Sequence, residues 1–130
     1  MYMAHSRFGA ARTRYETVDL SSRIEGASPH GLVGILFEEL IKGLDAMAAA
    51  CRRRDFSQRG TRQSRVLAIL AGLDSSLDHE QGGDVAASLA TIYREARRLT
   101  IAAAQENDPE HLVRAREMLA EIASAWHTIG

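Results

Sequence analysis

The chain has 130 residues, of which 45% are hydrophobic and 25% charged, and its formal net charge is −1. This composition is typical of a folded soluble protein, and the length suits one domain rather than two. Since the charges balance, no field of the whole molecule attracts the chain to nucleic acid or to an anionic membrane. The longest apolar runs are much shorter than a membrane span and the N-terminus lacks the apolar core of a signal peptide, so we expect a cytoplasmic protein without membrane insertion.

Residue types that would support catalysis or metal binding are sparse. The single cysteine, Cys51, excludes an internal disulfide and a multi-cysteine zinc site. The Glu-x-x-His pairs of di-iron helical bundles do not occur. Residues 39–43 follow the residue pattern of a histidine phosphotransfer motif, but Glu39 occupies the position of the histidine that would accept the phosphoryl group. We therefore expect no catalytic residue, no metal and no cofactor.

The first 27 residues differ from the rest of the chain. They hold glycine, serine and arginine with scattered apolar residues, and their helical pattern is weak. The apolar members nearest to the following helix are Tyr15, Val18, Leu20 and Ile24. We interpret residues 1–27 as an N-terminal arm or cap, and residues 28–130 as a single domain.

Helix start signals and helical spacing divide residues 28–130 into four stretches. Pro29 and Pro109 each follow a potential N-cap, Ser28 and Asp108, which is where a helix tolerates proline. The predicted helices are Pro29–Arg53, Phe56–Leu77, Asp84–Glu106 and Pro109–Thr128. No strand pattern occurs, and the short gaps place consecutive helices antiparallel. The sequence predicts an all-α protein, an antiparallel up-and-down four-helix bundle.

The segment between the second and third predicted helices has an unusual sequence, Leu77-Asp78-His79-Glu80-Gln81-Gly82-Gly83-Asp84. Two glycines can adopt the positive φ that other residues resist. The carboxylate of Asp84 can accept hydrogen bonds from the free N–H groups of a following helix. We therefore expect a glycine turn, with Asp84 as the N-cap of the third helix.

The first predicted helix has more apolar surface than three neighbours require, because its apolar residues cover about two thirds of the circumference instead of the usual ~100° stripe. Either the helix lies deep in the bundle and the arm covers the remainder, or the arm is a removable lid over a groove for a partner helix. A second face of the third helix, with Ala86, Ala90 and Ile101, is either another approach surface or merely solvated. The candidate groove residues are Leu20, Ile24, Phe37, Ile41, Ala86, Ala90 and Ile101.

Four blocks in a fixed order together closely resemble the FliS family of flagellar secretion chaperones, over about residues 15–128. The blocks are Ile24-Glu25-Gly26-Ala27-Ser28-Pro29, the apolar helix Leu32 to Leu44, the corner Leu77-Asp78-x-Glu80-x-Gly82-Gly83-Asp84, and Asn107-Asp108 with a helix ending at Trp126. The resemblance implies a four-helix bundle with an N-terminal helical cap. It implies a cytosolic export chaperone that binds the disordered C-terminal segment of flagellin, prevents premature polymerisation and keeps flagellin competent for type III export. Contact with the export gate and dimerisation of the free protein are left open.

Arginines gather around the first interhelical turn, at Arg52, Arg53, Arg54, Arg59, Arg62 and Arg65. Such a cluster can contact phosphates, which is the alternative of a nucleic-acid-associated helical protein. It can equally complement a helix dipole and remain solvated, or meet acidic residues of a protein partner. A further alternative is a purely structural helical-bundle subunit, in which the arm never leaves its groove.

Overall fold

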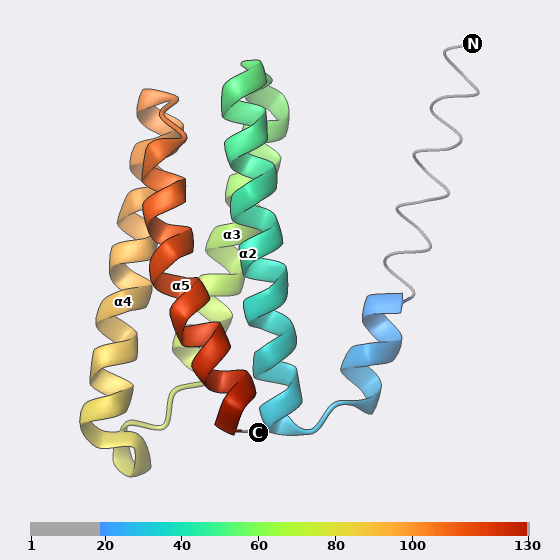
Figure 1. Ribbon diagram of the computed structural model, residues 1–130, viewed down its shortest axis with the longest axis vertical. Helices are drawn as coiled ribbons and strands as arrows, with labels where there is room; N and C mark the ends of the chain where they lie inside the picture. The colour runs from blue at the N-terminus through green and yellow to red at the C-terminus, as the bar shows by residue number, and fades with distance from the viewer. Residues whose placement is uncertain (1–18, 130) are drawn as a thin grey trace. The chain divides into compact units, whose positions relative to one another are not determined.

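A computed structural model describes residues 19–129, and this part of the chain is all-helical with no strand. The helices are α2 (Pro29–Arg53), α3 (Phe56–Ser75), α4 (His79–Glu106) and α5 (Glu110–Ile129), and residues 19–26 form a further helical segment (Figure 1). Tyr15 and Val18 of the predicted arm lie outside the described residues. Over residues 19–129 no helix is long and apolar enough to cross a membrane.

The chain divides into two compact units, and the boundary between them lies between Leu32 and Val33, inside α2. The predicted boundary, after residue 27, lies before this helix. Residues 33–129 form the larger unit, which we call the helical body.

Local signals set the ends of α2 and α5. The backbone N–H of Gly31 donates to Ser28 Oγ at 3.0 Å, and Pro29 occupies the first helical position, where no N–H is needed. At α5 the N–H of Glu110 donates to Asp108 Oδ1 at 3.0 Å. Both predicted caps are confirmed, and α2 has the predicted bounds.

The turn between α3 and α4 differs from the prediction. The N-cap of α4 is Asp78 rather than Asp84: its carboxylate accepts hydrogen bonds from the N–H groups of Glu80 and Gln81, at 3.1 and 3.0 Å. Asp78 can cap because its backbone is extended, so that its side chain reaches the first turn. Of the two glycines in this turn, only Gly83 takes a positive φ, +48°, and it interrupts the helix after that first turn. The predicted glycine break is therefore confirmed at Gly83, but the N-cap is Asp78 and a short helical turn precedes the break.

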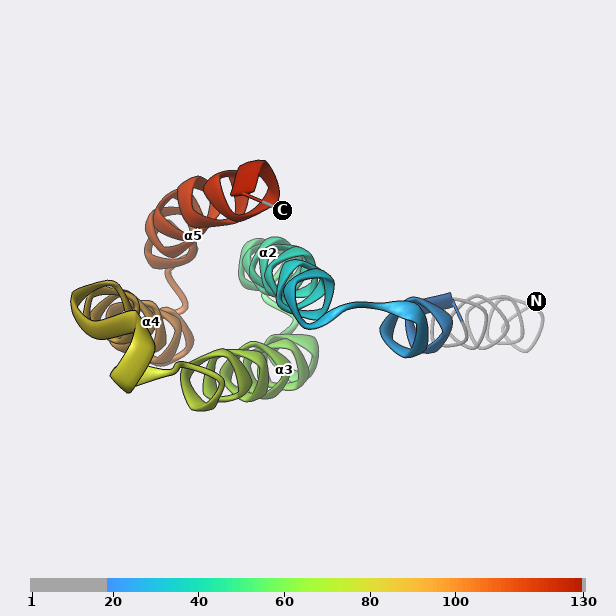
Figure 2. The ribbon, with the colours of Figure 1, turned by 90° about the horizontal axis from the view of Figure 1, so that it is seen from below.

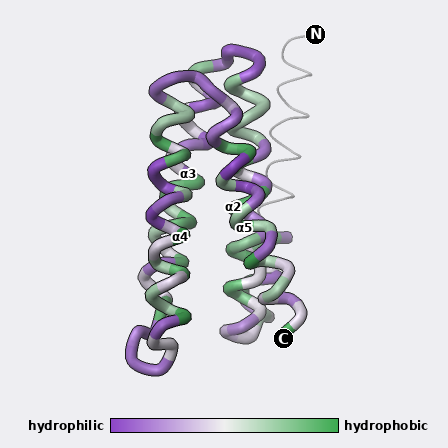
Figure 3. The backbone as a smooth tube through the Cα atoms, turned by 60° about the vertical axis from the view of Figure 1, so that its left-hand side comes forward, coloured by the Kyte–Doolittle hydropathy of each residue, from purple (hydrophilic) through white to green (hydrophobic). Residues whose placement is uncertain are grey.

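The four helices of the helical body run alongside one another and reverse direction at each turn, as the colour gradient in Figure 1 shows. Seen along the helices, α4 lies between α3 and α5 and packs closely against both (Figure 2). Every helix contributes to one buried cluster, whose largest fully buried members include Phe37, Leu40, Leu44, Met47, Leu73, Leu99, Leu112 and Leu119. Along each helix hydrophobic stretches alternate with hydrophilic ones, while the turns are strongly hydrophilic (Figure 3). This is the pattern of amphipathic helices around a shared core.

Candidate functional site

The candidate groove residues do not all lie at the surface. In the segment before α2, Ile24 is 41% exposed and Leu20 is half-buried. On α2, Ile41 is half-buried and packs against the core cluster. On α4, Ala86 and Ala90 are 3% and 9% exposed, whereas Ile101 is half-buried.

Phe37 is a core residue. Its side chain is 1% exposed, and its ring lies 6.4 Å from that of Trp126 on α5, centroid to centroid, at an interplanar angle of 59°. A tilted arrangement at this separation is favourable for two aromatic rings. The expectation that Phe37 lies on a spare, exposed face of α2 is therefore wrong, because α5 covers that face.

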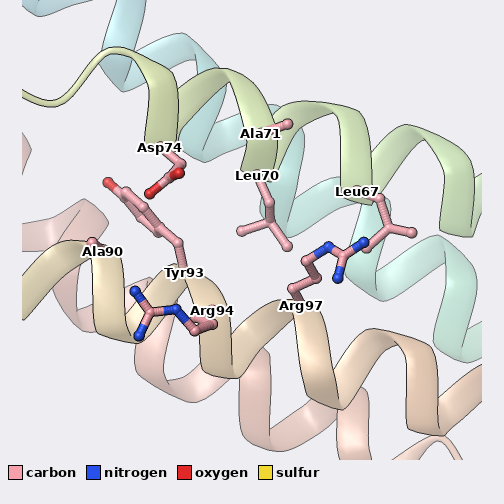
Figure 4. Close-up of a pocket in the computed structure, with 8 residues that line it drawn as sticks. All are labelled: Leu67, Leu70, Ala71, Asp74, Ala90, Tyr93, Arg94 and Arg97. Atoms are coloured by element: carbon pink, nitrogen blue, oxygen red, sulfur yellow. The ribbon is translucent and has the colours of Figure 1, made fainter.

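A hollow between α3 and α4 is a candidate site for binding a partner. We call it the α3–α4 groove; it has a volume of about 210 Å³ and is lined by Leu67, Leu70, Ala71, Asp74, Ala90, Tyr93, Arg94 and Arg97. In the close-up, Leu70 lies in the middle, between the two helices, with Asp74 beside the Tyr93 ring at one end (Figure 4). The exposed guanidinium groups of Arg94 and Arg97 come from α4. The groove thus has an apolar floor and a charged rim.

A second, wider hollow lies on the outer face of α4, with a volume of about 650 Å³. Its lining includes Ile101 and the Arg98–Glu95 pair, whose Nε and Oε2 atoms are 2.9 Å apart. Arg94 and Arg97 line both hollows. Two of the predicted residues, Ala90 and Ile101, therefore belong to neighbouring hollows that share this arginine pair.

Among the residues that line the α3–α4 groove, only Ala90 was predicted as a partner contact. The side chains that α3 contributes are Leu67, Leu70, Ala71 and Asp74. Their spacing of three, four and seven residues places them on one face of a helix, which is the signal that was available. Leu70 is the only buried residue of these four. This face of α3 therefore packs into the core along one edge and lines the groove along the other.

The groove places Tyr93 in an environment that disfavours its ionised form. Burial, with a smaller contribution from the nearby Asp74 carboxylate, raises the pKa of the Tyr93 hydroxyl from 10.0 to about 12. In the unfolded chain the phenol ionises near pH 10, whereas in the folded chain it stays neutral until about pH 12. The stabilising contribution of the neutral phenol is therefore complete below pH 10 and is lost between these two values.

We expect the free energy of unfolding to fall by about 1–2 kcal/mol between pH 10 and pH 12 because of Tyr93, a figure discounted because the groove opens to solvent. Urea unfolding followed by circular dichroism over this pH range measures the fall. Tyr93→Phe is the control, since it keeps the ring and removes the ionisable group. An equal fall in Tyr93→Phe would assign the pH dependence to other groups.

The comparison with known proteins agrees with the resemblance found in the sequence. The family model described as flagellar protein FliS matches residues 11–130. The flagellar secretion chaperone FliS of Vibrio cholerae is 34% identical over 115 residues, covering 88% of this chain and 85% of the relative. FliS of Salmonella typhimurium is 30% identical with 88% and 86% coverage, and FliSB of Pseudomonas aeruginosa is 27% identical with 92% and 94% coverage. The chain therefore belongs to the FliS family of flagellar secretion chaperones.

Proposed function

We propose that this chain is a cytosolic export chaperone that binds the disordered C-terminal segment of flagellin along the α3–α4 groove. Binding would cover the surfaces through which flagellin polymerises and keep the segment unassembled until it reaches the export gate. The role requires binding and release only, so no catalytic group takes part. The proposal includes an antiparallel up-and-down four-helix bundle over residues 28–130, with residues 1–27 as its arm.

The observation that supports this function most directly is the shape of the α3–α4 groove. Its volume of about 210 Å³ is below the ~300–1,000 Å³ of pockets that enclose small ligands. It suits one or two apolar side chains of a longer segment instead. The apolar floor and charged rim match an amphipathic helix that places its apolar face in the groove and its polar face toward solvent.

The proposed contact surface extends from the groove along α4. Ala90 lines the groove and Ile101 lines the adjoining hollow. Ile41, Ala86, Leu20 and Ile24 are proposed as further flagellin contacts, each on its own element. Phe37 contributes from inside the core, by holding α2 against α5. The small side chain of Ala90 permits a partner helix to approach the α4 backbone closely at the groove.

A disordered partner fits a chaperone that must later release it. The segment loses conformational entropy when it folds on the groove, so part of the interaction free energy is spent on ordering. The remaining affinity can be moderate even when a large surface is covered. Release at the export gate then requires no covalent step.

Filling the groove is the direct test of this function. Ala71 is exposed and lines the groove. The tryptophan side chain of Ala71→Trp would therefore fill the groove, where the partner is proposed to bind, without entering the core. We expect Ala71→Trp to weaken binding of a flagellin C-terminal peptide by about tenfold or more, since loss of a central pocket removes a large share of binding energy. Isothermal titration calorimetry measures the change.

The matched control is Ala125→Trp, which introduces the same side chain at an exposed alanine of α5, a helix that does not line the α3–α4 groove. This variant should bind the peptide as the unmodified chain does. Circular dichroism should show the same helical content for both variants. Equal peptide affinities of Ala71→Trp and Ala125→Trp would place the flagellin site elsewhere.

A further inference from the structure

The turn between α2 and α3 concentrates positive charge on a chain that is otherwise acidic. Residues 52–65 contain six arginines and one aspartate, whereas the whole chain has a net charge of −1. Outside this stretch, acidic side chains outnumber basic ones. We call the surface formed by Arg52, Arg53, Arg54, Phe56, Arg59 and Arg62 the basic corner.

An exposed aromatic ring organises the basic corner. Phe56 is the first residue of α3 and is 47% exposed. The guanidinium carbons of Arg54 and Arg59 lie 5.4 and 4.8 Å from the centroid of its ring. Both distances are within the range of cation–π attraction, so the ring holds two positive groups beside each other.

Arg54 reaches the ring through a backbone conformation that is unfavourable for arginine. It has φ +58°, and the N–H groups of Arg54 and Asp55 bond to the carbonyls of Cys51 and Ala50, at 3.1 and 2.9 Å. This is a Schellman ending of α2, in which glycine or asparagine usually takes the left-handed position. The equivalent ending of α4 uses Asn107, at φ +50°. Arginine in this position costs backbone strain. The same backbone conformation places the Arg54 guanidinium over the Phe56 ring.

Arg59 is fixed by hydrogen bonds, whereas the other arginines of the basic corner are exposed. Arg59 Nη1 donates to Asn107 Oδ1 at 3.0 Å, and Asn107 Nδ2 donates to the carbonyl of Cys51 at 3.2 Å. These bonds tie the ending of α4 to the basic corner. Within residues 19–129, no carboxylate lies within 4.0 Å of the guanidinium groups of Arg52, Arg53, Arg54 or Arg62, all of which are exposed.

From these observations we infer that the basic corner is a docking surface for a short acidic segment of a protein partner, separate from the α3–α4 groove. Carboxylates of such a segment would pair with the unpaired guanidinium groups, which present the fork geometry that carboxylates match. An apolar side chain between the carboxylates would rest on the exposed part of Phe56. Charge complementarity therefore defines the occupant.

A short acidic segment fits this surface better than nucleic acid does. A nucleic acid gains affinity by spreading many phosphate contacts over an extended positive surface. Here the positive charge is confined to one turn, and a longer polyanion would meet the excess of acidic side chains beyond it. Phe56 is the only aromatic residue in residues 52–65, so a stacking series for successive bases is absent from this stretch.

The test uses a fluorescein-labelled peptide of glutamates around one central leucine, with fluorescence anisotropy as the readout. Arg53→Gln/Arg62→Gln should weaken binding of this peptide by about five- to tenfold, the effect of losing two exposed charge pairs. Phe56→Ala, which changes no charge, should weaken it by about threefold because the two guanidinium groups lose their shared support. Both variants should retain the affinity of the unmodified chain for the flagellin C-terminal peptide.

Arg114→Gln/Arg116→Gln is the control, because it removes two exposed arginines of α5 that line neither hollow and lowers the net charge equally. Equal weakening by the two double variants would reduce the effect to overall charge and overturn the inference. Tighter binding of a labelled oligothymidine with the same number of negative charges would overturn it in favour of nucleic acid. Loss of flagellin peptide binding in Arg53→Gln/Arg62→Gln would merge this surface with the flagellin site, again against the inference.

Discussion

Phe37→Ala is expected to lower the free energy of unfolding by about 3–5 kcal/mol, the cost of removing a large aromatic side chain from a packed core. Phe37 is 1% exposed and loses its contact with Trp126 in this variant. The two rings link α2 to the last turns of α5, so the substitution leaves a cavity at the contact between these helices. Urea unfolding followed by circular dichroism measures the change as a shift of the midpoint.

The control for Phe37→Ala is Val85→Ala, because Val85 is 68% exposed. A surface truncation of this kind should change stability by no more than about 0.5 kcal/mol. Phe37→Ala would contradict the core assignment if it unfolded like Val85→Ala while losing the flagellin peptide. The distinction matters for mapping the partner surface: Phe37→Asp would abolish binding by unfolding the helical body, and its loss of binding would identify no contact.

Features that depend on a few neighbouring residues were predictable from the sequence. The bounds of α2 follow from Ser28 and Pro29 at its start, and Asp108 caps α5 as expected. The all-helical composition of the described part follows from the spacing of apolar residues in the same way. Each of these signals acts within one or two helical turns, so no tertiary information is needed.

The α3–α4 turn shows where local signals compete. Both Asp78 and Asp84 are good N-cap residues, and the glycine pair favours a break before Asp84. The chain uses Asp78, forms one helical turn, and only then bends at Gly83. Which aspartate caps depends on where the chain leaves α3, and α3 ends at Ser75 with Ser76 as its C-cap, two residues before Asp78.

The burial of Phe37 and the position of the groove required the tertiary structure. Periodicity shows that α2 has a wide apolar face, but the neighbour that covers each part of it depends on the register of α5. Trp126 reaches Phe37 only because the last turns of α5 lie beside α2. The groove likewise depends on which residues of α3 stand opposite Ala90 and Tyr93.

Gly43→Leu is expected to destabilise the chain by about 1–3 kcal/mol, the usual cost of overpacking a core. Gly43 is buried on α2, and a Cβ added there would lie 3.0 Å from Val66 Cγ2 on α3. Val66 is fully buried, so its side chain is packed on all sides. Gly72→Leu is the control, because a Cβ at the exposed Gly72 meets nothing within 4 Å. That variant should gain about 0.5–1 kcal/mol from helix propensity alone.

The opposite signs of these two glycine substitutions separate packing from propensity, because both replace glycine by leucine inside a helix. If the close approach of α2 to Val66 is the cause, Val66→Ala should restore much of the stability lost in Gly43→Leu, since it returns volume at the point of contact. Alone, Val66→Ala should destabilise by leaving a cavity. A double-mutant cycle measured by urea unfolding gives the coupling between the two positions. Additive effects would show that Gly43 is required for some reason other than the approach of α2 to α3.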